Sequence, residues 1–426
     1  MLSTILVALS LLSARGVIGA SYKIKDVKDF IVFAANVNAK KNFKGTTVTL
    51  ENDIVFTDEF SEYFGPVGPN ASAQFRGTFD GQGYKISNLK MKTNNWVMGL
   101  FGISRGITIR NVVIDDTCSF TSVYKSSSTN SMGALIGKCL GDDENCIIEN
   151  NVNMAPITFD GISSLYIADV FIGGLAGELV SYTFGTITNC ANYGTVTHSG
   201  LSDLTYMGGL AGQAFEYEAS NSFPIKNSVN YGAIVHSGTT TMDTFVIIGG
   251  LAGLSQRGVF ENCANYGEIK SNTKSNQTGN MVGWPRGIKI SNSYWNGKNP
   301  YGPVGAQYAQ ATVESAAFDV DTYKLEKAVT VGKYSGDSLL SALNAYVDAN
   351  PATPYSHWVT NKGGNSVIFT VNGVNRLVLK AKLIVLPNLA KEGKKAFAGW
   401  YTDSACKNLL KEYEINSDKF LYGTFK

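Results

Sequence analysis

The sequence of 426 residues is poor in charge: Asp, Glu, Lys and Arg make up 16% of it, and the formal net charge is +2. A chain with so little basic excess lacks the electrostatic footprint of a nucleic-acid-binding protein, so we expect no nucleic-acid partner. Beyond the N-terminus, no apolar run reaches the roughly 20 residues that a membrane-spanning helix needs. We therefore expect no transmembrane segment in the mature chain.

What the sequence does contain is a repeat. A branched or aromatic apolar residue, any residue, and then Asn recur seven times, and the Asn positions advance by 23, 39, 39, 38, 35 and 30 residues. Self-similarity at this spacing indicates a solenoid, a propeller or an array. The repeated residues are Asn88, Asn111, Asn150, Asn189, Asn227, Asn262 and Asn292.

Gly-framed apolar blocks separate these positions, including GGLAG at 173–177, 208–212 and 249–253. The intervening segments are rich in Asn, Gly, Thr and β-branched residues, which favour short strands and turns. A four-stranded propeller blade does not fit into the 23-residue step. The sequence therefore predicts an all-β fold, a parallel β-helix (β-solenoid). The shortest step is about one turn, and the longer steps are either two turns or one turn with an excursion.

Stacked coils place equivalent residues in columns about 4.8 Å apart. We expect the Ile and Phe column to point into the core and the seven Asn side chains to form a hydrogen-bonded amide ladder. Tyr193, Tyr231 and Tyr266 share another register, where an aromatic stack is favoured over a sugar-binding stripe. His198 and His236 share a third, where solvent-facing turn residues are favoured over a metal-binding or pH-sensitive pair. We expect no metal and no cofactor.

The six cysteines do not form a disulfide framework. Cys190 and Cys263 lie two repeat units apart, at least about 9.6 Å if each unit is one coil, which exceeds disulfide reach. They are interpreted as small buried side chains. Cys139 and Cys146 flank an acidic loop and are candidates for a local disulfide, with Cys118 as a competing partner.

The N-terminus carries the features of a secretion signal. Leu2–Leu12 is an apolar run followed by small residues near Ala20. We therefore expect residues 1–20 to be a signal peptide and the mature protein to be extracellular, either secreted or held at the cell surface. Asn70 and Asn276 begin Asn-X-Ser/Thr sequons, which would be N-glycosylation sites in a eukaryotic host.

A helical pattern follows at Asp26–Val37, within residues 21–45, where we expect a cap helix and the first strand. A solenoid needs such a cap, because its first coil otherwise exposes strand edges and an open core. The expected apolar stripe of the helix is Val27, Phe30, Ile31, Ala34 and Val37.

Residues 75–91, FRGTFDGQGYKISNLKM, together with GLFG at 99–102 and the GGLAG blocks with their Ile-X-Asn-Cys-X-Asn-Tyr-Gly units, resemble secreted β-helix proteins with GLUG-type repeats. The resemblance covers Tyr22 to Asn296. It implies a right-handed parallel β-helix over residues 46–300. Proteins of this kind are generally adhesin-like proteins of the cell surface, with no single shared catalytic site.

The remaining chain is expected to form two further segments. Residues 301–372 contain a helical stripe at Asp337–Ala349. Residues 373–426 resemble the Listeria–Bacteroides repeat, as found in the B-repeat of internalins, which implies a small β-grasp-like α+β surface module. The matching residues are Phe397, Gly399, Trp400, Tyr401, Asp403, Leu421 and Tyr422.

An enzyme on a β-helix would need clustered carboxylates for acid/base chemistry or Ca²⁺ binding. The acidic pairs Asp115-Asp116 and Asp142-Asp143 are interpreted as solvated loop residues. The column between the repeated apolar residue and Asn, expected to be exposed, is mixed in charge. Its members are Ser87, Arg110, Glu149, Thr188, Lys226, Glu261 and Ser291.

We therefore expect no catalytic site and a chain that is not an enzyme. The expected function is that of an adhesin-like surface protein whose β-solenoid face binds host or environmental glycans or proteins. The alternative is a secreted carbohydrate-active β-helix enzyme, either a polysaccharide lyase or a hydrolase. Three or more carboxylates converging in a groove would favour that alternative.

Overall fold

A computed structural model describes residues 21–62, 64–126, 128–142, 144–163, 168–241, 245–273, 277–305, 310–331, 334–353, 355–361, 363–371, 374–388, 397–411 and 413–425. The expected signal peptide at 1–20 and the sequon residue Asn276 lie outside these residues, and both stay predictions.

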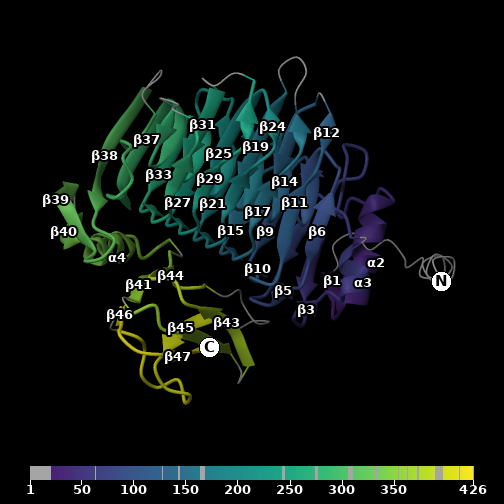
Figure 1. Cartoon of the computed structure of the whole chain (residues 1–426). Coiled ribbons are helices and arrows are strands. Elements are labelled where there is room, and N and C mark those ends of the chain that lie inside the picture. Colours follow the sequence, from purple (N-terminus) through teal and green to yellow (C-terminus); the bar gives the residue numbers. More distant parts are fainter. Residues whose placement is uncertain are drawn as a thin grey trace.

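Parallel strands stack in the order of the sequence repeats (Figure 1). β15 (Cys146–Glu149) pairs with β21 (Gly185–Thr188), which pairs with β27 (Phe223–Lys226). The stack continues through β33 (Gly258–Glu261) to β37 (Val282–Asn296). Each strand pairs with its copy one repeat further on, so one repeat is one turn of a parallel β-helix. The predicted fold class is confirmed, and the two-turn interpretation of the longer steps is wrong.

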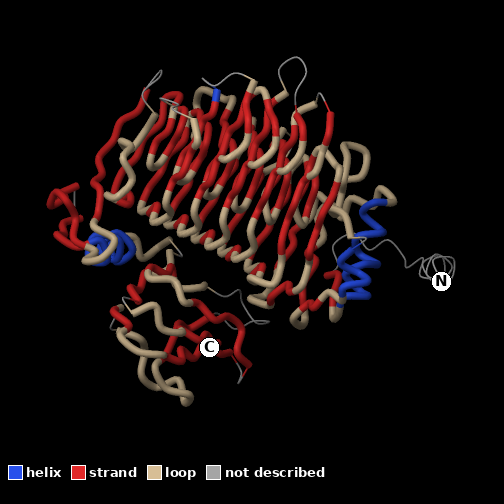
Figure 2. The backbone as a smooth tube through the Cα atoms, viewed as in Figure 1, coloured by secondary structure: helices blue, strands red, loops and turns tan. Residues whose placement is uncertain are grey.

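The β-helix has several parallel stacks of strands along its length (Figure 2). Three stacks belong to its largest sheet. The first contains β8 (Phe101–Ser104), β14 (Ile136–Gly141), β20 (Ala176–Ser181), β26 (Ala211–Glu216) and β32 (Ala252–Gln256). The second contains β4 (Thr78–Asp80) and β9 (Ile107–Arg110) before β15. The third contains β3 (Ile54–Val55), β5 (Lys85–Ser87), β10 (Val113–Ile114), β16 (Val152–Asn153), β22 (Ala191–Asn192), β28 (Val229–Asn230) and β34 (Ala264–Asn265).

Three smaller parallel sheets complete the coils. One holds β6 (Lys90–Thr93), β11 (Ser119–Ser122), β17 (Ile157–Phe159), β23 (Val196–His198), β29 (Ile234–His236) and β35 (Ile269–Ser271). Another holds β7 (Val97–Met98), β13 (Asn130–Met132), β19 (Asp169–Gly173), β25 (Leu204–Gly208), β31 (Val246–Gly249) and β36 (Thr278–Gly279). The shortest holds β12 (Lys125–Ser126), β18 (Ile162–Ser163), β24 (Leu201–Ser202) and β30 (Thr239–Thr240). It begins only at β12, so the coil from Asn88 to Asn111 adds no strand to it, in keeping with the 23-residue step.

The repeated triplet marks a turn as well as a column. Its apolar residue is fully buried in every copy, as expected: Ile86, Ile109, Ile148, Ile187, Ile225, Phe260 and Ile290. All seven repeated Asn residues have left-handed backbone, with φ from +45° at Asn292 to +58° at Asn88. Apart from Gly, Asn is among the few residues that adopt this conformation readily. The repeat therefore selects Asn for its backbone as well as for its amide.

An amide ladder connects five of the seven. The side-chain nitrogens of Asn189, Asn227, Asn262 and Asn292 each donate to the amide oxygen of the preceding Asn, at 3.0, 2.7, 2.6 and 2.7 Å, beginning at Asn150.

The first two members of the column have other acceptors. Asn111 donates to Asp80 at 2.9 Å, and Asn88 donates to the carbonyl of Phe56 at 2.7 Å. The ladder predicted over all seven residues is therefore wrong at this end. The coil before Asn111 offers a carboxylate there, which is a stronger acceptor than an amide.

A second ladder runs through the core-side turn that follows. Asn153, Asn192 and Asn230 donate to the amide oxygen of the next copy, at 2.8, 2.9 and 2.9 Å, ending at Asn265. Each also bonds the carbonyl oxygen two residues ahead. This direction is opposite to that of the first ladder. Sequence analysis missed it, although three of these residues begin the Asn-Tyr-Gly triplets.

A helix closes the N-terminal end of the β-helix (Figure 2). α2 (Val27–Asn38) follows β1 (Ser21–Ile24), which pairs with β2 (Thr47–Leu50). Its N-cap, Asp26, accepts hydrogen bonds from two backbone N–H groups of the first turn. The buried face is Phe30, Phe33, Ala34 and Val37. Val27 and Ile31 of the expected stripe are only partly buried, whereas Phe33, which was not expected there, is fully buried. Its ring packs against four other rings: Phe43, Phe75, Phe79 and Phe101. A short helix, α3 (Asp58–Glu62), follows β3.

The C-terminal part folds back against the long side of the β-helix (Figure 1). After β38 (Gln310–Phe318), the hairpin β39 (Lys324–Val331) and β40 (Tyr334–Ser338) leads into α4 (Leu339–Ala349). Two small sheets follow. One contains β41 (Trp358–Asn361), β44 (Leu383–Val385) and β46 (Glu414–Ile415). The other contains β42 (Val367–Val371), β43 (Val374–Leu379), β45 (Phe397–Tyr401) and β47 (Lys419–Phe425).

The ladder and the C-terminal part are joined at Asn227. Its amide oxygen accepts from Trp358 Nε1 at 2.7 Å, and its nitrogen donates to the carbonyl of Ser356 at 2.8 Å. The expected division into 21–45, 46–300, 301–372 and 373–426 stays a prediction. β42, which precedes the expected boundary, pairs with β43 and β47, which follow it.

At Asn227, mutation can separate the contribution of the positive-φ backbone from that of the side-chain hydrogen bonds. Asn227→Gly keeps a residue that tolerates positive φ but removes the four side-chain hydrogen bonds, so we expect a loss of about 2–4 kcal/mol in unfolding free energy. Asn227→Ala should cost about 1 kcal/mol more, because Ala is strained in left-handed backbone. Chemical denaturation measures both. Lys92→Ala, on the exposed face of β6, is the control and should change stability by less than about 0.5 kcal/mol. Values for both Asn227 variants that match the control would contradict the ladder's role.

Candidate functional site

The column between the repeated apolar residue and Asn is not an exposed face. Its charged members pair across coils: Arg110 lies 2.8 Å from Asp80, and Lys226 lies 2.7 Å from Glu261. Glu261 also accepts from the hydroxyl of Tyr346 in α4, at 3.1 Å. The expected exposed column is therefore wrong in part: Ser87 and Ser291 are buried, and the C-terminal part covers Glu261 through Tyr346. Arg110 and Glu149 remain partly exposed.

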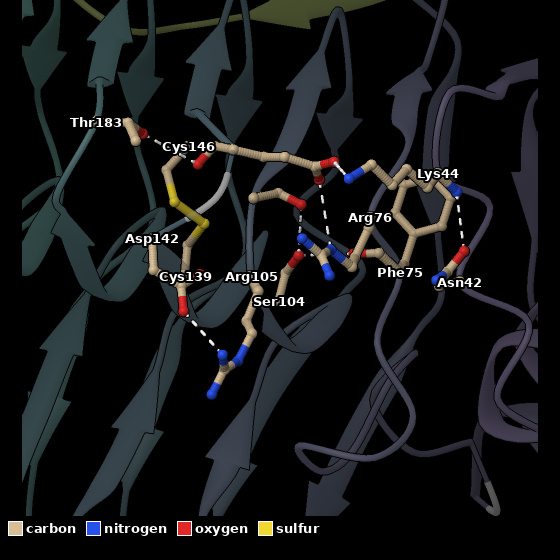
Figure 3. A network of polar contacts seen from close by, with 12 residues as sticks. Asn42, Lys44, Phe75, Arg76, Ser104, Arg105, Cys139, Asp142, Cys146 and Thr183 are labelled. Carbon is tan, nitrogen blue, oxygen red and sulfur yellow. Dashed lines mark hydrogen bonds and ion pairs between the residues drawn. A yellow bond between two sulfur atoms is a disulfide. The ribbon is translucent and has the colours of Figure 1, made fainter.

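Cys139 and Cys146 are joined by a disulfide, and both side chains are buried (Figure 3). The loop that it closes reaches toward the N-terminal coils. Asp142 pairs with Arg105 at 2.8 Å, and Glu144 pairs with Lys44 at 2.6 Å. The disulfide therefore closes an acidic loop whose ion pairs connect neighbouring coils. We interpret the role of this loop as structural.

Cys190 and Cys263 are small buried core side chains, as expected. Cys118, Cys190 and Cys263 are buried and unpaired by disulfides. The sulfur of Cys190 lies 3.5 Å from the backbone nitrogen of Asn151, and Ser228 takes the corresponding place for Cys190 at 3.0 Å. Burial raises the pKa of the Cys190 and Cys263 thiols to about 12, so these cysteines are poor nucleophiles.

The other sequence candidates lie apart from one another. Asn70 is exposed and its amide oxygen caps Ser72, so the sequon is at the surface. Asp115 is buried in a turn, where it accepts from Ser87 and Thr117. Asp116 is exposed, and Asp143 lies outside the described residues. In the described ranges, no group of three or more His, Cys, Asp or Glu side chains could hold a metal ion.

The two repeated histidines are in the core. His198 and His236 are 0% and 1% exposed, and their rings stack at 4.9 Å. Phe159 stacks on His198 from the preceding coil at 5.2 Å. The solvent-facing interpretation is wrong, because His236 aligns with Ser271 and not with Lys270. The imidazoles therefore occupy an inward position of the strand, as Phe159 does.

A pocket of about 560 Å³ lies between the β-helix and β43. This volume is within the usual range for a small-molecule site. Residues in or next to the third stack of strands form one wall, and residues 375–381 form the other. The lining residues are Lys85, Val113, Asp115, Asp116, Met154, Tyr193, Tyr231, Asn375, Arg376, Leu377, Val378, Leu379, Lys380 and Ala381.

The tyrosine column forms part of this wall. Tyr231 stacks on Tyr266 at 4.5 Å, and Tyr193 tilts against Tyr231 with ring centres 5.7 Å apart. Tyr266 donates to the carbonyl of Val320 at 3.1 Å. The hydroxyl of Tyr193 is buried without a hydrogen-bond partner in the described residues, and burial raises the pKa of Tyr193 above its usual value. The column is thus a structural stack whose first two members also face a pocket.

Arg376 is held at the pocket by an aromatic ring. Its guanidinium carbon lies 3.7 Å from the centre of the Tyr84 ring, within the range of a cation–π contact. Sequence analysis did not select Arg376, because the residues that match the Listeria–Bacteroides repeat begin only at Phe397. No repeat or motif marks it, and only the folding back of the chain brings it to the β-helix.

A separate carboxylate cluster lies outside the main core, beside the apolar cluster formed by Phe171 and its neighbours. Glu178 pairs with Lys138 at 2.9 Å and accepts from Ser131. Burial first, and then the charge of Glu178, raise the pKa of Asp169 to about 6. Asp203 raises it further, although it is itself bonded by Thr241 at 2.6 Å.

No family model and no curated protein matches this chain. Among solved structures, it is similar to a crystal structure described as a putative immunoglobulin A1 protease from Bacteroides ovatus. The identity is 18%, the TM-score is 0.41, and the alignment covers 63% of this chain and 83% of that one. Within the described residues, no helix combines the length and apolarity that crossing a bilayer requires.

The expectation that this chain is not an enzyme is contradicted by that neighbour, which is described as a protease. The Listeria–Bacteroides and GLUG resemblances have no counterpart among these matches.

The buried histidines predict a pH dependence. Burial, followed by the charge of His236, lowers the pKa of His198 to about 3 from its ordinary 6.5. The unfolded chain takes up a proton at this residue below pH 6.5 while the folded protein does not, so stability falls as pH drops from 6.5 towards 3. His198→Phe should remove the loss of unfolding free energy that His198 causes, which is about 2 kcal/mol at pH 5. Urea denaturation at pH 7.5 and pH 5 measures it. His357→Phe, at a partly exposed residue, is the control. Equal acid sensitivity in wild type and His198→Phe would contradict the prediction.

Proposed function

We propose that this protein is an extracellular, adhesin-like β-helix of the GLUG-repeat type that binds surface glycans in the pocket between its tyrosine column and β43. The pocket is the observation that carries the proposal. It combines tyrosine rings with charged groups of both signs in about 560 Å³. Aromatic faces and a few oriented polar groups are what recognition of a polar, ring-shaped ligand needs.

Location and architecture support the same proposal. A buried disulfide is typical of proteins from oxidising compartments, in keeping with the secretion signal proposed for residues 1–20. The exposed Asn70 sequon is compatible with that location. The Listeria–Bacteroides-like segment, which we propose to be a surface module, supplies one pocket wall through residues 375–381. Binding would then depend on the β-helix and this module together.

A second candidate is a carbohydrate-active enzyme, and one observation favours it. Burial raises the pKa of Asp169 to about 6 beside Glu178 and Asp203, and a carboxyl group with a raised pKa is a feature of general acids. A turnover assay on a polysaccharide panel with wild type and Asp169→Asn tests it. Activity that disappears in Asp169→Asn supports the enzyme, and no turnover by wild type rejects it.

Filling the pocket tests the proposed function. Val378 lines it and is 46% exposed, so Val378→Trp should place an indole in the pocket with little cost to the fold. Wild type should bind members of a glycan array, and the variant should lose at least about 90% of that signal, about 1.4 kcal/mol. Val55→Trp is the matched control, because Val55 is 56% exposed on a strand and is not among the residues that line the pocket. Loss in both variants, or in neither, would contradict binding in this pocket.

A further inference from the structure

The pocket has three cationic side chains and two carboxylates. Lys85 comes from β5 on the β-helix, and Arg376 and Lys380 come from the opposite wall. In the part of the chain that the structure describes, none of the three lies in an ion pair. This sets them apart from the charges of the neighbouring column, where Arg110 and Lys226 have carboxylate partners.

The two carboxylates are not equivalent. Asp115 is 7% exposed, and its oxygens accept from Ser87 and from the backbone and hydroxyl of Thr117. Its charge is therefore already stabilised by donors of its own turn. Asp116 is exposed and also belongs to the lining. With three cations outside ion pairs and one carboxylate stabilised by its own turn, the lining has an excess of positive charge.

Arg376 is also oriented. The Tyr84 ring holds one face of its guanidinium at 3.7 Å, and no described residue accepts a hydrogen bond from its side chain. A guanidinium presents five N–H donors in a planar fork that matches a carboxylate. Fixing that plane before binding lowers the entropy lost when a ligand is bound. On the opposite wall, the hydroxyl of Tyr193 is buried without a hydrogen-bond partner in the described residues.

We infer that the ligand of this pocket is an acidic sugar, whose anionic group is bound by Arg376 with support from Lys85 and Lys380. The inference rests on the proposed function, since it names the class of glycan for the same site. A carboxylate and a sulfate ester share the required charge and acceptors. A neutral sugar would leave the three cations unpaired, so the pocket discriminates by charge.

Three probes with one common core test the inference: lactose, 3′-sialyllactose and lactose 3′-sulfate, measured by isothermal titration calorimetry on the full mature chain. We expect at least one acidic probe to bind about tenfold or more tightly than lactose. Arg376→Gln should remove that preference and leave the weak lactose affinity within about twofold. Asp116→Asn should strengthen binding of the acidic probe, because it removes a negative charge from the lining of the pocket.

Arg286→Gln is the matched control. Arg286 lies 4.3 Å over the Trp284 ring, so the variant loses the same kind of cation–π contact away from the pocket. It should bind like wild type, and thermal unfolding should show that both arginine variants are folded. If Arg376→Gln unfolds, Lys380→Gln, at an exposed residue of the same wall, replaces it and should lower acidic-probe affinity by about threefold or more.

The outcomes separate this inference from the proposed function. Preference for sialyllactose identifies a carboxylate, and preference for the sulfate identifies a sulfate ester; either supports an acidic sugar if Arg376→Gln abolishes it. Equal binding of all three probes, blocked by Val378→Trp, overturns the inference and leaves the proposed function intact. An acidic preference that survives in Arg376→Gln overturns the assignment of the site. Absence of binding by every glycan on the array overturns both.

Discussion

The structure depends on a bend of the backbone that recurs in seven successive coils. At each of seven positions an Asn adopts positive φ directly after a strand whose apolar residue is fully buried. This bend gives the next strand a new direction. Each strand still pairs in register with the equivalent strands of the coils on either side. The side-chain amides of five copies are hydrogen-bonded in series. Loss of one Asn side chain therefore also removes hydrogen bonds of the neighbouring coils. Stability in such a solenoid is mainly a sum of these nearest-neighbour terms.

The fold was predictable because each coil repeats the same local solution. The buried Ile or Phe, the Asn after it and the Gly-framed block constrain the chain within one turn, and seven copies make the pattern unmistakable. Details that depend on a particular neighbour were not predictable. Asn111 bonds Asp80 because that coil happens to carry a carboxylate. His198 and His236 looked like turn residues until the register placed Ser271, and not Lys270, beside His236.

The candidate site was only partly visible in the sequence. Tyr193 and Tyr231 were found through their shared register, and Asp115 and Asp116 as an acidic pair. Arg376 and Lys380 were not, because they reach the pocket through long-range packing of β43 against the coils. One apolar cluster joins Val113 and Val152 of the β-helix to residues of the C-terminal sheets. No local pattern encodes that contact, since its two sides lie more than two hundred residues apart in the chain.

The same packing connects stability to binding. The C-terminal part contacts Glu261 through Tyr346 and Asn227 through Trp358, and the same part of the chain forms the second wall of the pocket. A crystal structure of the mature protein with 3′-sialyllactose tests this account most directly. The account predicts that the sugar lies between Tyr193, Tyr231 and residues 375–381, with its carboxylate on Arg376. A sugar bound elsewhere on the β-helix, with this pocket unchanged, would contradict it.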